Sequence, residues 1–333
     1  MKFGVLQFFS WPERRVPLDT VFARALQRIE IMDRTGYDAV WLAEHHFSGF
    51  SVCPSVHVMG AHVAARTQRL RIGTAVSLAA FYHPLRLAEE VALLDVLSGG
   101  RVDWGAGRGF DRTEFENFGV TLEESAARFR EAVEIVLAAW KSDRIDFDGR
   151  FHHFHGVEVL PKPLQKPHPP VWVAASSESA IEWAAQQGHS ILMDPHAAHV
   201  EIGRKRALYR KLLVENGHSP EGREIPTARL LAVAPSEAEA REVARRGASW
   251  IVGSYMGDAH AMIFDPKNLT GLNAIPEPAE RSVKGSVIHG TPESVTEQIQ
   301  KLQQEIGLEY LMCAPLSHES FVLFTEKVLP KLR

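Results

Sequence analysis

The 333-residue sequence is 45% hydrophobic and 23% charged, which is ordinary for a globular chain long enough to form one large domain or two. Its formal net charge of -4 provides no basic field for nucleic acid or anionic lipid, and its apolar runs are too short to cross a membrane. With two cysteines, Cys53 and Cys313, neither a disulfide framework nor a zinc cluster is expected, and the chain fits the reducing cytoplasm.

Strand-like and helix-like segments alternate through the first half of the chain. Leu87, Val91 and Leu94 have the spacing of one helical face and follow a proline that favours a helix start. Thr121 and Glu124 form a capping-box pattern, which predicts the start of a long helix. The expected strands are residues 2–8, 38–43, 70–76 and 101–107, and the expected helices are 18–35, 54–66, 84–98 and 121–141.

The same alternation continues after a long interruption. Residues 142–169 lose the helical period and are rich in aromatic, His, Gly and Pro residues, which predicts an excursion loop. Residues 253–286 break into Gly, Pro, Asp and Asn, which predicts a second long and mobile loop. Further strands are expected at 170–175, 189–193, 227–234 and 309–314, with helices at 177–187 and 197–216 and others that begin near 236, 291 and 317.

Eight strand–helix units in strict order predict a parallel sheet covered by helices, and eight is the number that closes a barrel. We therefore expect a single α/β domain over residues 1–333, a (β/α)8 TIM barrel with long loops at its carboxyl-terminal face. A doubly wound open sheet is the rival fold. Residues 8–12, which follow the first strand, lack the glycine-rich turn of a dinucleotide site, and this counts against the rival.

Polar side chains at the carboxyl ends of the strands line the active site of such a barrel. The second strand ends in Glu44, His45 and His46. Because side chains alternate along a strand, Glu44 and His46 share one side and His45 faces the other. No comparable cluster of acidic residues and histidines stands at another strand end, so no metal site is expected. His45 is a candidate general base, with a hydrogen-bonded structural histidine as the alternative.

Two other strand ends carry features suited to an anion. Arg108 stands between Gly107 and Gly109, and backbone without side chains beside a guanidinium suits the close approach of a flat ring or a phosphate. A plain turn with a surface arginine is the alternative. Ser176 and Ser177 follow the fifth strand and can cap its helix, whose first-turn amides can bind an anion. Together, the two features indicate a phosphate-bearing ligand.

Six stretches occur in a characteristic order: WLAEHHF from residue 41, LRIGTA from 70, YHPLR from 82, LDVLSGGR from 94, GAGRG from 105 and VAASS from 173. In this order they resemble the luciferase-like flavin monooxygenases, the group of bacterial luciferase. The resemblance extends to GTPESV from residue 290. It implies an enzyme that takes reduced FMN from a separate flavin reductase and oxygenates a small organic substrate with O2 through a flavin hydroperoxide. It also implies a homodimer.

The resemblance implies roles for individual residues as well. His45 corresponds to a base near the flavin, and Glu44 corresponds to a glutamate beside the isoalloxazine. Thr74 and Ala75 correspond to a pair at which the family often has a non-prolyl cis peptide packed on the ring. The loop at 253–286 corresponds to a lid segment that closes over the flavin. The residues implied to bind the FMN phosphate are Arg108, Arg128, Ser176 and Ser177, and Gly107 is implied to belong to the flavin site as well.

One departure limits the analogy with light emission. Gly107 stands where the light-emitting members have a reactive cysteine, so a generic monooxygenase is expected. A deazaflavin-dependent oxidoreductase and a non-catalytic flavin-binding relative are the alternatives on the same fold. A hydrolase is disfavoured because no pair of strand-end acids is present. An apolar substrate is suggested by the pocket-facing candidates Phe8, Trp11, Phe110 and Met193, although such residues often belong to a barrel core.

Overall fold

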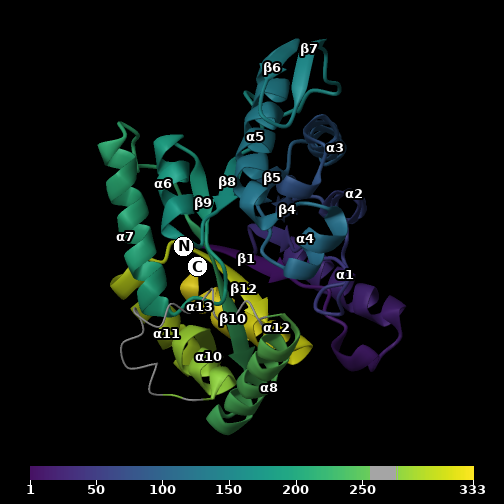
Figure 1. Ribbon diagram of the computed structural model, residues 1–333. Coiled ribbons are helices and arrows are strands. Elements are labelled where there is room, and N and C mark those ends of the chain that lie inside the picture. The colour runs from purple at the N-terminus through teal and green to yellow at the C-terminus, as the bar shows by residue number, and fades with distance from the viewer. Residues whose placement is uncertain (256–274, 276) are drawn as a thin grey trace.

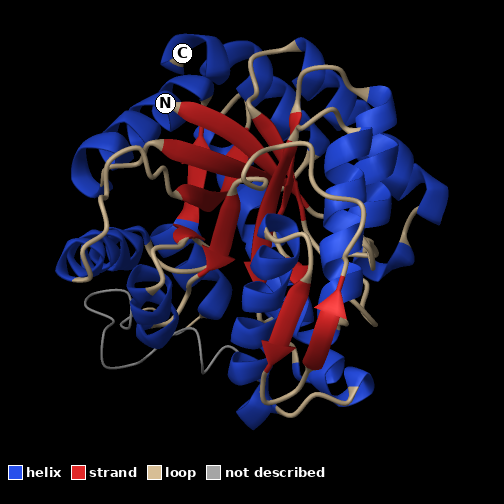
Figure 2. Ribbon diagram, turned by 90° about the horizontal axis from the view of Figure 1, so that it is seen from above, coloured by secondary structure: helices blue, strands red, loops and turns tan. Residues whose placement is uncertain are grey.

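A computed structural model describes residues 1–255, 275 and 277–333, and its centre is a parallel β-sheet surrounded by helices (Figure 1, Figure 2). The strands of the sheet are β1 (Lys2–Gln7), β2 (Ala39–Leu42), β3 (Arg71–Thr74), β4 (Ser77–Leu78), β5 (Val102–Gly107), β8 (Val171–Ala174), β9 (Ser190–Leu192), β10 (Pro226–Val233), β11 (Val287–Gly290) and β12 (Tyr310–Pro315). Their order is β11-β10-β12-β1-β2-β3-β5-β8-β9, with β4 paired to β5. All eight expected strands are present, and β4 and β11 are additional.

The ladder of paired strands has two ends among the described residues, so the curled sheet is open. The closed (β/α)8 barrel expected from the sequence is therefore wrong in this respect. Its path ends at β9, and within the described residues a single bridge, between Met193 and Thr227, links this end to β10. There the Met193 N–H donates to Pro226 O and the Ala228 N–H donates to Met193 O, both at 2.9 Å. β10 pairs along its length with β12 and β11, and β9 has only three residues. Few backbone groups of β10 are therefore available for pairing with β9.

Helices cover the outer face of the sheet. They are α1 (Leu18–Arg34), α2 (Val56–Arg66), α3 (Pro84–Leu97), α4 (Arg112–Phe118), α5 (Leu122–Lys141), α6 (Glu178–Gln186), α7 (His199–Glu215), α8 (Glu237–Tyr255), α10 (Pro278–Ser286), α11 (Pro292–Ile306), α12 (His318–Leu323) and α13 (Leu329–Leu332), with short turns η1 (Pro12–Arg14) and η2 (Ala79–Phe81) and a π-helical turn η5 (Phe324–Val328). The expected cap is confirmed, since Thr121 Oγ1 accepts the Glu124 N–H at 3.3 Å. In the described part of the chain, none of these helices combines the length and the apolar character that crossing a membrane requires.

Two segments expected as loops contain regular structure. Within residues 142–169, β6 (Ile145–Asp148) and β7 (His153–Val157) form an antiparallel hairpin that projects beyond α5 (Figure 1). These strands are only partly buried and mixed in polarity, so their sequence shows no alternation of hydrophobic residues that would predict them. Within 253–286, α8 continues to Tyr255 and α10 begins behind Glu277, whose carboxylate accepts the Ala279 N–H at 3.1 Å. The rest of the expected lid, 256–274 and 276, lies outside the described residues.

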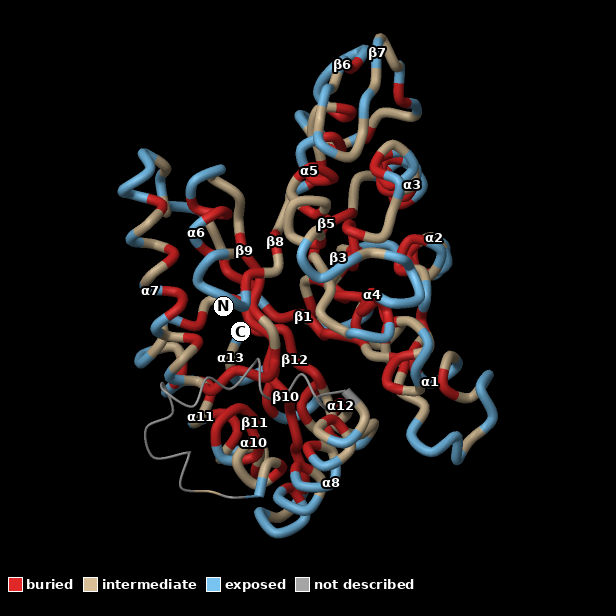
Figure 3. The backbone as a smooth tube through the Cα atoms, in the orientation of Figure 1, coloured by how far each residue is buried: buried red, intermediate tan, exposed pale blue. Residues whose placement is uncertain are grey.

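The strands of the sheet are buried along most of their length (Figure 3). Alternation along them divides the core into an inner and an outer layer of buried side chains. Val40 and Leu42 pack between the sheet and the helices, as expected, while Trp41 points inward. The Trp41 indole N–H donates to the Tyr310 hydroxyl at 3.0 Å. A Cβ at Gly73 would lie 2.3 Å from the Trp41 ring, so glycine is required beneath the indole. The inside of the sheet is therefore filled at this level.

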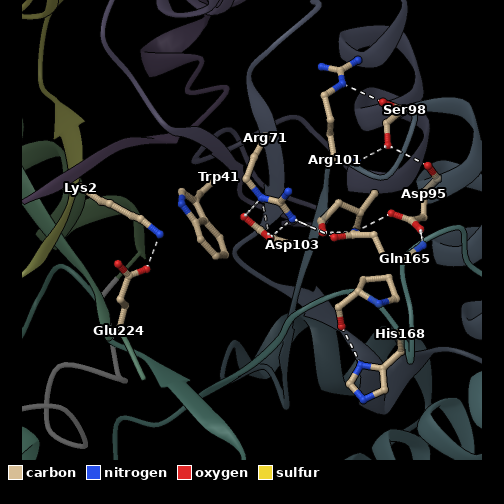
Figure 4. A network of polar contacts seen from close by, with 12 residues as sticks. Lys2, Trp41, Arg71, Asp95, Ser98, Arg101, Asp103, Gln165, His168 and Glu224 are labelled. Carbon is tan, nitrogen blue, oxygen red and sulfur yellow. Dashed lines mark hydrogen bonds and ion pairs between the residues drawn. The ribbon is translucent and has the colours of Figure 1, made fainter. Parts of the chain in front are cut away.

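A polar network ties the amino-terminal part of β3 to β5 and to the segment after the hairpin (Figure 4). The Arg71 guanidinium donates from Nε to both carboxylate oxygens of Asp103 at 3.0 Å. It also donates from Nη2 to Gln165 Oε1 at 3.2 Å, and Gln165 Nε2 donates to Asp95 Oδ1 at 2.7 Å. These groups lie at the amino-terminal end of the strands, where side chains of a barrel usually serve stability. The carboxyl-terminal end is the one at which catalytic residues are expected.

Candidate active site

His45 lies inside the sheet at the end of β2. Like Trp41 and Ala43 before it, His45 faces the inside of the sheet, and the residue is buried at 8% exposure. Its imidazole contacts the rings of Phe8, Phe50 and Phe110, with centroids 6.4, 5.1 and 6.5 Å away. An imidazole enclosed by three aromatic rings is shielded from bulk water, which suits proton transfer to a bound ligand.

Glu44 and His46 face the opposite side, as strand alternation predicts. Glu44 is 2% exposed, and its Oε1 lies 3.1 Å from His46 Nε2. Its Oε2 accepts a hydrogen bond from the Tyr82 hydroxyl at 3.1 Å. Burial, and then the Glu44 charge, raise the pKa of Tyr82, so the phenol stays protonated and remains the donor. Glu44 therefore belongs to a polar group on the helix side of the sheet and lies on the other side from His45.

Glu114 connects the two histidines and was missed by the sequence analysis. It lies on α4, is 1% exposed and accepts the His46 backbone N–H at 2.9 Å. The same oxygen, Oε1, lies 3.4 Å from His45 Nδ1. A buried carboxylate in this position fixes the orientation of the imidazole. The available signal was the spacing of Asp111 and Glu114, since Asp111 caps α4 by accepting the Thr113 N–H at 2.7 Å.

Arg108, at the end of β5, is a half-buried cation. Its Nη1 donates one long hydrogen bond, 3.4 Å, to Ser125 Oγ on α5. Within the described residues no carboxylate lies at ion-pair distance from its guanidinium. Burial lowers its pKa, which reflects a cation taken from water without compensation by a negative charge. Such a site favours an anionic ligand.

Gly107 packs against the side chain of Val76. A Cβ at Gly107 would lie 2.4 Å from Val76 Cγ2 and 3.5 Å from the Ala174 Cβ. The valine therefore fills the space that a cysteine side chain would need at this position. This contact gives a physical reason for glycine in place of the cysteine of light-emitting relatives.

Thr74 and Ala75 do not form the cis peptide that the resemblance implied. The non-prolyl cis bond is one position further on, between Ala75 and Val76. Thr74 continues β3, and the Ala75 N–H still donates to Leu42 O at 2.7 Å, so the trans bond between them preserves the ladder. The Thr74 hydroxyl donates to Gly105 O at 2.7 Å and accepts the Gly105 N–H at 2.9 Å. Thr74 thus joins β3 to β5 at the point where their backbones diverge.

Ser176 and Ser177 follow β8, the neighbour of β5. Ser177 caps α6 by accepting the Ala180 N–H at 3.3 Å, and its Oγ lies 3.2 Å from Ser179 Oγ. These serines are exposed, so their hydroxyls can reach a ligand. Because Gly107 approaches Ala174 across the sheet, the segments that carry Arg108 and the serines start from adjacent positions. The structure therefore places the two expected anion-binding features side by side.

Arg128 has a different environment. Its Nε lies 3.3 Å from Glu124 Oε2, its guanidinium lies 4.3 Å from the centre of the Phe151 ring, and it lines a cavity of about 240 Å³ beside η2. Arg130 lies on the side of α5 that faces α6, 5.4 Å from the Trp183 ring. The implied phosphate contact of Arg128 stays a prediction, and Arg130 becomes a second candidate.

His196 and Asp194, directly after β9, were also missed by the sequence analysis. Burial lowers the pKa of His196 to about 4, Asp194 opposes this effect, and the charges of Arg229 and His45 add to it. Both missed residues follow an expected strand end, so the criterion that selected His45 would have found them. Within the described residues, no three His, Cys, Asp or Glu side chains gather as metal ligands.

A family model described as luciferase-like monooxygenase matches residues 1–309. The chain belongs to this family. The family resemblance drawn from the ordered sequence motifs is thus confirmed.

Individual proteins of the family show the same relationship. The oxygenase component of flavin-dependent trigonelline monooxygenase from Acinetobacter baylyi is 33% identical over 227 residues, 67% of this chain and 62% of that protein. The alkanal monooxygenase alpha chain of Photorhabdus luminescens is 30% identical over 243 residues, 72% of this chain and 66% of that one. The chain spans between half and two thirds of the length of the curated relatives that it matches first. The crystal structure of monooxygenase RslO1 from Streptomyces bottropensis aligns over 100% of both chains with a TM-score of 0.84 and 28% identity.

Proposed function

We propose that this chain is a flavin-dependent monooxygenase that binds FMN at the carboxyl-terminal edge of β5 and β8. The proposal rests on one observation: Arg108 and the start of α6 lie at neighbouring strand tips of the same sheet edge as the enclosed His45. A phosphate between these features would give Arg108 an anionic partner and would accept hydrogen bonds from serine hydroxyls and first-turn amides. The printed names of the two curated relatives, a flavin-dependent monooxygenase and an alkanal monooxygenase, support this assignment.

The residues present fit a planar cofactor as well as its phosphate. Gly107 leaves the β5 backbone without a side chain, and Ala75 and Val76 contribute small apolar surfaces on the inner side. When bound, reduced flavin supplies the electrons and activates O2, which is chemistry that no side chain provides. The protein binds the phosphate, orients the ring and encloses the reacting atoms among aromatic residues.

His45 is the group that we assign to proton transfer. With its Nδ1 directed toward Glu114, Nε2 is the atom that takes up or returns a proton inside the aromatic enclosure. Glu114 is a positioning residue because it acts through the imidazole. Glu44, on the other side of β2, is likewise assigned a positioning role through its contacts with His46 and Tyr82, in place of the flavin-side role implied by the resemblance.

We further propose a two-component system, in which a separate flavin reductase delivers reduced FMN. The phrase "oxygenase component" in the name of the trigonelline relative supports this arrangement. The homodimer implied by the resemblance stays a prediction.

Binding titrations with FMN, riboflavin and a reduced deazaflavin separate the possible functions. The expected result is FMN binding that is stronger than riboflavin binding, followed by oxygen-dependent product formation when a flavin reductase is added. Tight deazaflavin binding with oxygen-independent hydride transfer would establish the oxidoreductase alternative. FMN binding without turnover across aldehydes, ketones and carboxylates would indicate a non-catalytic flavin binder.

A further inference from the structure

A second feature of the carboxyl-terminal edge is a cavity of about 370 Å³. It lies where the ends of β1, β10 and β12 meet α1, α8 and the start of α12. Its volume falls within the range of roughly 300–1,000 Å³ that is usual for small-molecule sites. Its apolar wall includes Leu6, Phe8, Phe50, Leu230 and Ile251.

This cavity adjoins the candidate active site. Phe8 and Phe50 line the cavity, and both rings also contact the imidazole of His45. A ligand whose apolar body occupies the cavity therefore extends toward the enclosure of the proposed base.

The cavity wall also holds buried polar atoms that have no protein partner. Eight buried side-chain nitrogen or oxygen atoms among the described residues make no hydrogen bond. Four of the eight belong to residues that line this one cavity: Gln7 Oε1, Arg28 Nε, Trp250 Nε1 and His318 Nδ1. Because buried polar groups are nearly always satisfied, the side chains around this cavity are unusually poor in polar contacts within the protein.

The charge of the cavity selects the kind of ligand. Arg28 and Arg24 lie one helical turn apart on α1 and both line the cavity. Burial, and then the charge of Arg24, lower the pKa of Arg28 to about 10, and Glu319 opposes this shift. Glu319 does not line the cavity, and within the described residues neither arginine has a carboxylate within 4 Å. The arginines give the lining a cationic part, and the aromatic and aliphatic residues give it an apolar part.

We propose that this cavity binds an organic carboxylate with an apolar body. The carboxylate pairs with Arg28 and Arg24, and the apolar body lies along Phe8 and Phe50 toward His45. The site deepens the proposed function by naming a carboxylate as the substrate class. Oxygenation of the carboxylate rests on the proposed function, whereas binding of the carboxylate in this cavity does not.

Isothermal titration with three ligands of equal chain length tests the charge requirement on the flavin-free protein. The probes are decanoate, decanal and decylamine. We expect decanoate to bind at least about tenfold more tightly than decanal, since hydrogen bonds to a charged group are the stronger kind, and decylamine to bind least. Equal binding of decanoate and decanal, or no binding of decanoate, would overturn the proposal.

Two variants of α1 locate the site. Arg28→Met keeps the length of the side chain and should weaken decanoate binding at least about tenfold, while the affinity for FMN stays unchanged. Arg34→Met, at the exposed end of the same helix, is the matched control and should leave decanoate binding unchanged. Unchanged decanoate binding in a folded Arg28→Met variant would contradict the assignment. Failure of FMN to bind the wild-type protein would instead remove the proposed function and leave the carboxylate site standing.

Discussion

Oε1 of Glu114 lies 3.4 Å from Nδ1 of His45, although the two residues are separated by 69 positions in the chain. The same oxygen accepts the His46 backbone N–H at 2.9 Å, so one carboxylate holds both the ring and the backbone of the strand end. This arrangement restricts the imidazole to one orientation within its aromatic enclosure. We expect the chemistry to depend on that orientation.

Removal of the imidazole should separate binding from catalysis. His45→Ala is expected to bind FMN within about threefold of wild type but to lose on the order of 10²–10⁴ in substrate oxygenation, the usual contribution of a general base. Added imidazole should restore part of the lost rate. Steady-state turnover with a flavin reductase, measured beside an FMN titration, gives both quantities. Unchanged turnover would refute the assignment of His45 as a base.

Replacement of Arg108 should discriminate between flavins that differ only in the phosphate. Arg108→Ala is expected to weaken FMN by about 10–100-fold, because a charge-assisted hydrogen bond contributes roughly 1.5–3 kcal/mol, and to affect riboflavin little. Fluorescence titrations of both flavins provide the test. Arg144→Ala, at the exposed start of the hairpin, serves as the control. An equal loss for FMN and riboflavin would argue against a phosphate role.

The contact between Gly107 and Val76 predicts a compensating pair of substitutions. Gly107→Ala should lower the free energy of unfolding by about 1–3 kcal/mol, because its Cβ would overlap Val76 Cγ2. The double variant Gly107→Ala/Val76→Ala should recover much of this loss. Thermal or denaturant unfolding measures both. Gly253→Ala, where a Cβ would meet no atom of the described residues within 4 Å, should be neutral or slightly stabilising. Additive effects of the two substitutions would show that the contact is unimportant.

Buried histidines should make the fold sensitive to mild acid. Burial is the main cause that lowers the pKa of His196 to about 4 and that of His199 to about 3. The unfolded chain takes up these protons near pH 6.5, whereas the folded chain does so at lower pH, so stability falls as the pH drops from about 6.5 toward 4. Each histidine should cost on the order of 2 kcal/mol at pH 5.

The variant His199→Gln should reduce the loss of Tm between pH 7 and pH 5. His155→Gln, in the exposed hairpin strand β7, should leave that loss as it is in wild type. Thermal unfolding across this pH range checks the prediction. An identical pH dependence in wild type and His199→Gln would show that His199 does not carry the effect.

The sequence predicted those features that follow from local periodicity. All eight expected strands are present, the opposite orientations of Glu44 and His45 followed from strand alternation, and Ser177 caps its helix as its type suggests. Each of these depends on residues that are near neighbours in the chain. The spacing of apolar and capping residues along the chain was therefore sufficient to predict these features.

Features that depend on tertiary contacts were not predicted. The seven residues of α4 are too few to show a helical period, so Glu114 had no assigned place. The fit of Val76 against Gly107 joins two segments that are far apart in sequence. β9 and β10 are joined by a single bridge among the described residues, because β9 is short and β10 is long. The sequence of either strand alone does not predict how the two pair.

The most direct test of the central claim is rapid mixing of the protein, loaded anaerobically with reduced FMN, with oxygenated buffer. Absorbance spectra are followed in the presence and absence of decanoate. If the chain is a flavin-dependent monooxygenase, a transient species that differs from both reduced and oxidised FMN should form, and in the His45→Ala variant the yield of oxygenated product should fall. Reoxidation with the same spectra and rate as free reduced FMN would contradict the account.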